Sequence, residues 1–144
     1  MPPRALYDVN LLIALYDPLH ARHDDAHKWH RTHGAKGWAS CPLTQNGLMR
    51  IMSQPRYANP QPLAQLVHAV REFSGDATHQ FWPDDISLAS VGVLHDGAIM
   101  TAGALTDLYL LALAVRHSGR LITLDSRIRH TAVFGATAEH LVML

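Results

Sequence analysis

The chain is poor in cysteine and has no excess charge of either sign. Cys41 is the only cysteine among 144 residues, so no internal disulfide can form. The 12 Lys and Arg residues balance the 12 Asp and Glu residues. This balance excludes a basic surface that attracts nucleic acid over its whole area. Any contact with nucleic acid must therefore come from a local patch or a metal site.

Long apolar runs and phosphate-binding glycine motifs are also missing. The longest apolar run, 108–115, is far shorter than the roughly 20 residues that span a bilayer. The apolar stretch near the N-terminus is interrupted by Asp8, which is atypical of a secretory signal. We therefore expect a soluble cytoplasmic protein. The chain contains neither G-x-G-x-x-G nor a P-loop, which argues against a nucleotide-binding enzyme.

The composition is that of one compact globular domain. Hydrophobic residues make up 48% of the chain and charged residues only 17%, which excludes a disordered protein. A length of 144 residues allows one α/β core and is too short for two ordinary domains. We therefore predict a single domain over residues 1–144.

Strand-like and helix-like segments alternate along the chain. The predicted strands are 5–7, 37–40, 79–82, 121–124 and 140–144. The predicted helices are 10–16, 20–33, 44–53 with Thr44 as its cap, 63–73, and 106–117 with Thr106 as its cap. The segment 84–103 fits short helices, although no single period dominates it. This alternation predicts a parallel sheet covered by helices on both faces.

Three aspartates fall at the ends of predicted elements. Asp8 ends the first strand, Asp125 ends the strand 121–124, and Asp107 lies at the start of the helix 106–117. Ligands bind at the carboxyl edge of an open parallel sheet, and helices begin at the same edge. Carboxylates gathered there repel one another unless a proton or a cation intervenes. Carboxylate oxygens suit Mg²⁺ or Mn²⁺, and such an ion can support hydrolysis of a phosphodiester.

Other interpretations of these aspartates remain open. Asp107 can simply stabilise a helix N-terminus, and Asp8 and Asp125 can be turn residues after strands. A phosphotransfer domain with an aspartate nucleophile also places Asp8 after its first strand. Such domains usually have a second Asp nearby, whereas this chain has Asn10.

Several polar residues near the three aspartates can support such a site. Asn10 can hydrogen-bond around a metal or begin a helix. Thr123 either lines the site or fills a strand position. Arg50 can hold a phosphate or pair with an acid, and Arg127 and Arg129 either contact an RNA backbone or remain solvated.

Three histidines recur at helical spacing in the predicted helix 20–33. His23, His27 and His30 can form a transition-metal face. Because no cysteine or carboxylate accompanies them on that face, we predict a polar surface instead.

Short motifs in this chain resemble those of PIN domains. The segments 6–12 (LYDVNLL), 105–114 (LTDLYLLALA) and 121–125 (LITLD) resemble three acidic PIN motifs in their usual order. The segments 38–44 and 81–85 extend the similarity over nearly the whole chain. The resemblance is closest to the VapC toxins of toxin–antitoxin pairs.

The resemblance implies a fold, an activity and partners. The implied fold is a PIN-like three-layer α/β/α sandwich with a five-stranded parallel sheet. The implied activity is that of a Mg²⁺- or Mn²⁺-dependent endoribonuclease whose metal is held by Asp8, Asp107 and Asp125. The implied partners are an RNA substrate, a second copy in a homodimer and a cognate VapB-type antitoxin that blocks the site.

One position departs from the family pattern. Similar family members carry Glu where this chain has Gln45, which is uncharged. The resemblance thus implies that Gln45 joins the catalytic residues without contributing a charge. We expect weaker metal binding and a slow or conditional nuclease, which Gln45→Glu would accelerate. The alternative is a PIN-like module that binds RNA or protein through a weakened or inactive site.

Overall fold

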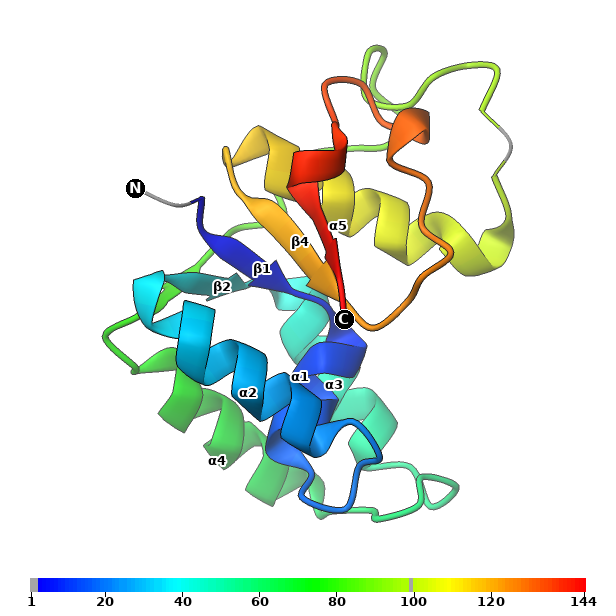
Figure 1. Cartoon of the computed structure of the whole chain (residues 1–144). Helices are drawn as coiled ribbons and strands as arrows, with labels where there is room; N and C mark the ends of the chain where they lie inside the picture. The colour runs from blue at the N-terminus through cyan, green and yellow to red at the C-terminus, as the bar shows by residue number, and fades with distance from the viewer. Residues whose placement is uncertain (1–2, 99) are drawn as a thin grey trace.

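A five-stranded parallel sheet forms the centre of the protein, as predicted. The computed structural model describes residues 3–98 and 100–144. The strands are β1 (Ala5–Tyr7), β2 (Trp38–Ser40), β3 (His79–Phe81), β4 (Arg120–Thr123) and β5 (Leu141–Met143). Their order across the sheet is β3-β2-β1-β4-β5, and every neighbouring pair is parallel (Figure 1).

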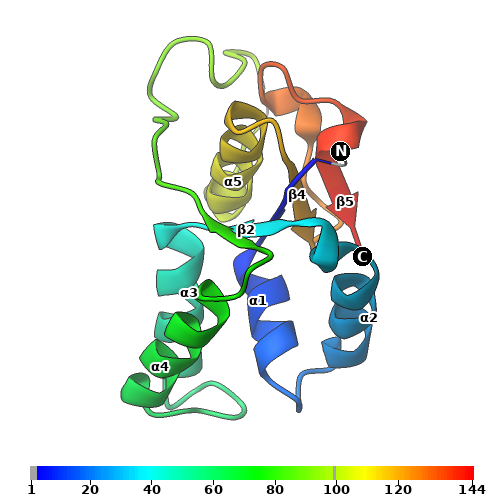
Figure 2. The ribbon, with the colours of Figure 1, turned by 90° about the vertical axis from the view of Figure 1, so that its left-hand side faces the viewer.

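Helices cover both faces of this sheet and produce three layers. The α-helices are α1 (Val9–Tyr16), α2 (His23–His33), α3 (Pro42–Met52), α4 (Leu63–Ser74) and α5 (Leu105–Arg116). The short 3-10 helices are η1 (Gly34–Lys36), η2 (Ala102–Ala104), η3 (His130–Ala132) and η4 (Ala138–His140). Figure 2 shows α1 to α4 on one side of the sheet and α5 on the other. The predicted α/β/α sandwich is therefore confirmed.

The central strand β1 is buried on both sides. Leu6 packs into the apolar cluster around α5, whereas Ala5 and Tyr7 pack into the cluster formed with the helices of the opposite layer. Each of these three side chains is at most 1% exposed. Alternating contacts of this kind fix the register of the strand, since a slip of one residue would exchange the two faces.

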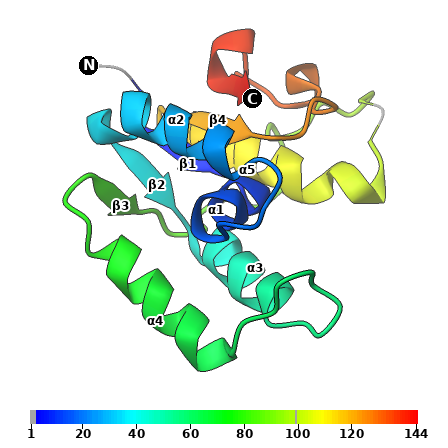
Figure 3. The ribbon, with the colours of Figure 1, turned by 60° about the horizontal axis from the view of Figure 1, so that its bottom comes forward.

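The histidines of α2 neither form a free polar surface nor gather into a metal face. The His23 ring lies 2.7 Å from the carbonyl oxygen of Ala14, and the His27 ring lies 2.9 Å from that of Leu15. Both carbonyls belong to the last turn of α1, where no intrahelical partner exists. His30 bonds the Tyr7 hydroxyl at 2.7 Å. The contacts of His23 and His27 attach α2 to α1, and the contact of His30 attaches it to β1. Figure 3 shows α2 and α3 on either side of α1.

Two predicted helix caps are wrong. The helix α3 begins at Pro42, with Cys41 as its cap, and the Thr44 hydroxyl accepts a 3.0 Å hydrogen bond from the Cys41 backbone. The helix α5 begins at Leu105, so Thr106 already lies inside its first turn. A polar residue one or two positions inside a helix has the same sequence signature as a cap.

The segment 84–103, whose apolar residues fit short helices without a dominant period, has no α-helix among its described residues. It consists of turns and η2, and its residue 99 lies outside the described residues. An isolated bridge pairs Leu94 with Val133, and the His95 backbone donates to Ala132 at 2.9 Å. Its backbone bonds therefore tie it to the loop after β4. In the described ranges, no helix is both long and apolar enough to cross a bilayer.

Candidate active site

The three aspartates meet at the point where the strand order of the sheet changes direction. From β1 the chain continues to β2 and β3 on one side, and then returns to β4 and β5 on the other. The connections that follow β1 and β4 therefore lead to opposite sides of the sheet, and a ligand can bind at the carboxyl ends of strands where this happens. Asp8 directly follows β1, and Asp125 follows β4 by two residues.

Thr123 connects two of the aspartates. Its hydroxyl donates to Oδ2 of Asp8 and accepts a 3.0 Å hydrogen bond from the Asp125 backbone N–H. The other carboxylate oxygen of Asp8 caps α1 by accepting from the Leu11 backbone at 2.7 Å. The Asp8 backbone extends the β1–β4 ladder by donating to Ile122 at 3.1 Å. Thr123 is therefore a fully buried part of the site's framework.

The aspartates line one cavity of about 490 Å³, which we call the acidic cavity. Of the residues singled out in the sequence, it is lined by Asp8, Asn10, Arg50, Asp107, Asp125 and Arg127. Two further residues line it: Asn46, and Thr106, which the sequence indicated only as a helix cap. The four-residue spacing from Asn46 to Arg50 places both on one face of α3, and this signal was available in the sequence.

Gln45, which the family resemblance places among the catalytic residues, does not line this cavity. Its side-chain amide donates to the hydroxyls of Ser40, at 3.0 Å, and Ser74, at 3.4 Å. Neither serine lines the acidic cavity. One residue along a helix rotates the side chain by about 100°. Asn46 therefore lines the cavity, whereas Gln45 bonds to β2 and α4.

Burial and mutual repulsion disfavour the charged forms of two aspartates. Burial is the main cause that raises the pKa of Asp8 to about 6, with added repulsion from Asp107 and Asp125. The hydrogen bonds from Thr123 and Leu11 oppose this rise. Burial also raises the pKa of Asp107, and the charge of Asp125 and a hydrogen bond with it add to the rise. A proton or a cation is what relieves such a cluster.

Asp125 differs from the other two because Arg127 neutralises it. Its Oδ1 accepts from the Arg127 backbone at 2.8 Å and from Nε at 3.1 Å, and its Oδ2 accepts from a terminal guanidinium nitrogen at 3.2 Å. These bonds lower the pKa of Asp125. The Arg127 side chain is 88% exposed, so this pair is open to solvent and to competing ligands.

The donor atoms suit a hard divalent cation, although they do not yet enclose one. Carboxylate oxygens are the ligands that Mg²⁺ and Mn²⁺ prefer. Within residues 3–98 and 100–144, no three His, Cys, Asp or Glu side chains lie close enough to hold a metal as they stand. Both oxygens of Asp125 contact Arg127. The three aspartates therefore fit such an ion chemically, provided that Asp125 exchanges Arg127 for it.

Known proteins share this architecture and much of this sequence. No protein-family model matches the chain. Ribonuclease VapC44 of Mycobacterium tuberculosis is 43% identical over 141 residues, covering 98% of this chain and 99% of the relative. Ribonucleases VapC39 and VapC29 of the same organism are 36% and 37% identical, covering 91% and 87% of this chain and 95% and 88% of their own lengths.

Two solved structures share the fold at low sequence identity. The M. tuberculosis toxin VapC20, described as cleaving the sarcin-ricin loop, superposes with a TM-score of 0.59 at 10% identity, covering 85% of this chain and 91% of its own. VapBC2 of Rickettsia felis, bound to promoter DNA, superposes with a TM-score of 0.55 at 13% identity, covering 84% and 87%.

Together these observations classify the protein. The parallel sheet, its helical layers and the carboxylates at the switch point define a domain of the PIN class. Identity of 43% over nearly the full length of both chains shows that this chain belongs to the VapC ribonuclease family.

The raised pKa of Asp8 predicts that Asp8→Asn stabilises the fold above about pH 6. In the unfolded chain this carboxyl has its ordinary pKa of 3.8, and in the folded protein about 6. The contribution of Asp8 to the free energy of unfolding is therefore greatest below pH 3.8, where the carboxyl is protonated in both states. This contribution is lost as the pH rises through 6, because the buried carboxyl must then become charged. The neutral Asn avoids the loss and keeps an oxygen for the Leu11 N–H.

Urea unfolding in the presence of EDTA measures this effect. At pH 7 we expect Asp8→Asn to exceed the wild type by on the order of 2–3 kcal/mol in free energy of unfolding, with the gain shrinking toward pH 4. Asp96→Asn, at an exposed position, is the control. A variant that is less stable than the wild type at pH 7 would contradict the electrostatic interpretation.

Proposed function

We propose that this protein is a metal-dependent endoribonuclease that acts as the toxin of a type II toxin–antitoxin pair. The observation that carries the proposal is the convergence of Asp8, Asp107 and Asp125 on one cavity at the switch point of a VapC fold. The curated relatives at 36–43% identity are named ribonucleases, which supports RNA as the substrate class.

Each part of the acidic cavity has a role in this proposal. Asp8, Asp107 and Asp125 would hold Mg²⁺ or Mn²⁺, which when bound polarises the phosphodiester and supplies an activated water. Thr123 keeps the Asp8 carboxylate in place through its hydroxyl. Arg50 is exposed at the cavity wall, and its guanidinium group can bind a non-bridging phosphate oxygen.

Arg127 gives the cavity a second cation whose position depends on what is bound. It is paired with Asp125 in this structure. If Asp125 held a metal, the Arg127 guanidinium group would be free to bind the substrate phosphate beside the carboxylates. A charge-assisted bond to phosphate would then replace the bond to Asp125.

The alternative of a binding module with a weakened site loses its main support. That alternative depended on the missing charge at Gln45. Because Gln45 bonds to Ser40 and Ser74 outside the acidic cavity, its neutrality removes no charge from the cavity.

Cleavage of labelled RNA by the purified protein tests the proposed activity. We expect Mn²⁺- or Mg²⁺-dependent cleavage that falls at least about a hundredfold in Asp107→Asn, since the neutral amide cannot stabilise a divalent ion in the same way. Asp96→Asn, which lies outside the acidic cavity, should cleave normally. The proposal fails if the wild type cleaves no RNA with either metal, or if Asp107→Asn retains full activity.

The different directions of Gln45 and Asn46 predict different effects of adding a carboxylate on α3. Asn46→Glu adds a negative charge to the acidic cavity and should tighten Mn²⁺ binding about threefold to tenfold in calorimetric titration. Gln45→Glu, its neighbour on the same helix, should leave the Mn²⁺ affinity unchanged. Tighter binding in Gln45→Glu alone would show that Gln45 does reach the metal.

The proposed partners are a VapB-type antitoxin and a second copy of the chain in a homodimer. The R. felis neighbour was solved as a VapBC pair, which supports an antitoxin here.

Expression in the cytoplasm, where we place the protein and its RNA substrate, should arrest growth. Asp107→Asn at equal abundance should not. Equal arrest by both proteins would contradict a toxic nuclease, and sedimentation equilibrium would measure the dimer.

A further inference from the structure

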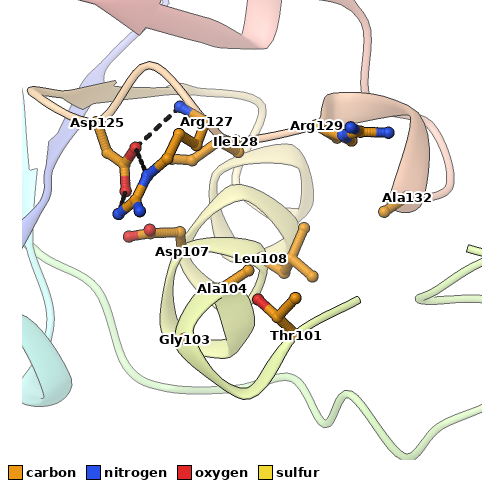
Figure 4. Close-up of a pocket in the computed structure, with 10 residues that line it drawn as sticks. All are labelled: Thr101, Gly103, Ala104, Asp107, Leu108, Asp125, Arg127, Ile128, Arg129 and Ala132. Carbon is orange, nitrogen blue, oxygen red and sulfur yellow. Dashed lines mark hydrogen bonds and ion pairs between the residues drawn. The ribbon is translucent and has the colours of Figure 1, made fainter. Parts of the chain in front are cut away.

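A second cavity of about 340 Å³ opens beside the acidic cavity, and we call it the side cavity. The two cavities share Asp107, Asp125 and Arg127 in their walls. Figure 4 shows the two carboxylates at one end of the side cavity and Ala132 at the other, with Leu108 between them. A ligand that reacts at the carboxylates therefore has an adjoining space of the size range of small-ligand sites.

The inner wall of the side cavity is apolar and firmly held. Leu108 of α5 is 3% exposed, and Ile128 and Ala132 from the loop after β4 are 8% and 4% exposed. All three belong to the apolar cluster on the α5 side of the sheet. The backbone of Ala132 is bonded on both sides, donating to Arg129 at 3.2 Å and accepting from His95 at 2.9 Å. The cavity is therefore a preformed part of the fold.

The rim of the side cavity is cationic and polar. Arg129 lines it, is exposed, and forms no ion pair within the described parts of the chain. Arg129 is absent from the acidic cavity, so it serves only the side cavity. Thr101 adds a hydroxyl that can donate or accept a hydrogen bond. An apolar wall and an exposed arginine in one cavity match the flat face of a nucleobase and its flanking phosphate.

We propose that the side cavity is a base-binding subsite, which holds one unstacked base of the RNA next to the bond to be cut. The inference rests on the proposed nuclease function, because the carboxylates that would hold the reacting phosphodiester also form one end of this cavity. Leu108, Ile128 and Ala132 contact the face of the base, and Arg129 contacts its phosphate. The subsite thus positions the backbone over Asp107 and Asp125.

An abasic scan combined with cavity-filling variants tests this subsite. In an RNA that the wild type cleaves, we expect removal of one particular base beside the cut to lower kcat/KM by about tenfold. Ala132→Phe, which fills the cavity, should lower kcat/KM on the intact RNA similarly and should lose its sensitivity to that abasic position. Ala104→Leu, at a partly exposed lining position, repeats the test if Ala132→Phe does not fold.

A control and a binding measurement separate this inference from the proposed function. Ala138→Phe, exposed and outside both cavities, should remain as sensitive to the abasic position as the wild type. Fluorescence anisotropy in EDTA measures RNA affinity without cleavage, and Arg129→Ala should weaken it severalfold. If the abasic position lowers kcat/KM equally in Ala132→Phe, Ala138→Phe and the wild type, the subsite is overturned and the nuclease function stands. If the wild type and all variants fail to cleave RNA, but RNA affinity still depends on the base at one position, the nuclease function is overturned and the subsite stands.

Discussion

The parallel pairing of β1 with β4, completed by the Thr123 hydroxyl, is the constraint on which the site depends. Pairing of Tyr7 with Ile122 places Asp8 and Thr123 side by side at the carboxyl edge. Thr123 then joins a carboxylate from the start of the chain to the backbone of Asp125. Because both strands are buried on two faces, neither can slip without exposing its core residues.

The same arrangement destabilises the folded protein electrostatically, because it buries a carboxylate next to two others. Such a cluster is better explained by ligand binding than by fold stability. A carboxylate that is 3% exposed, beside two others, holds its proton up to about pH 6. Proteins retain such strain chiefly at sites where a ligand relieves it. Arg127 relieves part of it at Asp125 from an exposed position, so a metal or a phosphate can displace that pairing.

The two cavities together describe how an RNA strand could be held. The acidic cavity offers oxygen ligands together with Arg50 and Arg127, and the side cavity offers an apolar wall together with Arg129. The loop after β4 connects them, since Asp125 belongs to both and Ala132 closes the far end. Backbone hydrogen bonds join that loop to the segment 84–103, so this irregular segment helps to hold the wall of the side cavity in place.

The sequence by itself determined the alternation of strands and helices and the positions of the three aspartates at their ends. Those features depend on local periodicity and on apolar residues that must be buried. The tertiary structure alone decided what each polar side chain contacts. Gln45 and Asn46 are neighbours on α3, yet Gln45 bonds to Ser40 and Asn46 lines the acidic cavity. His23 of α2 contacts a carbonyl oxygen of α1, and no pattern in the sequence predicts this contact. The strand order, and hence the switch point, likewise arises from long-range pairing.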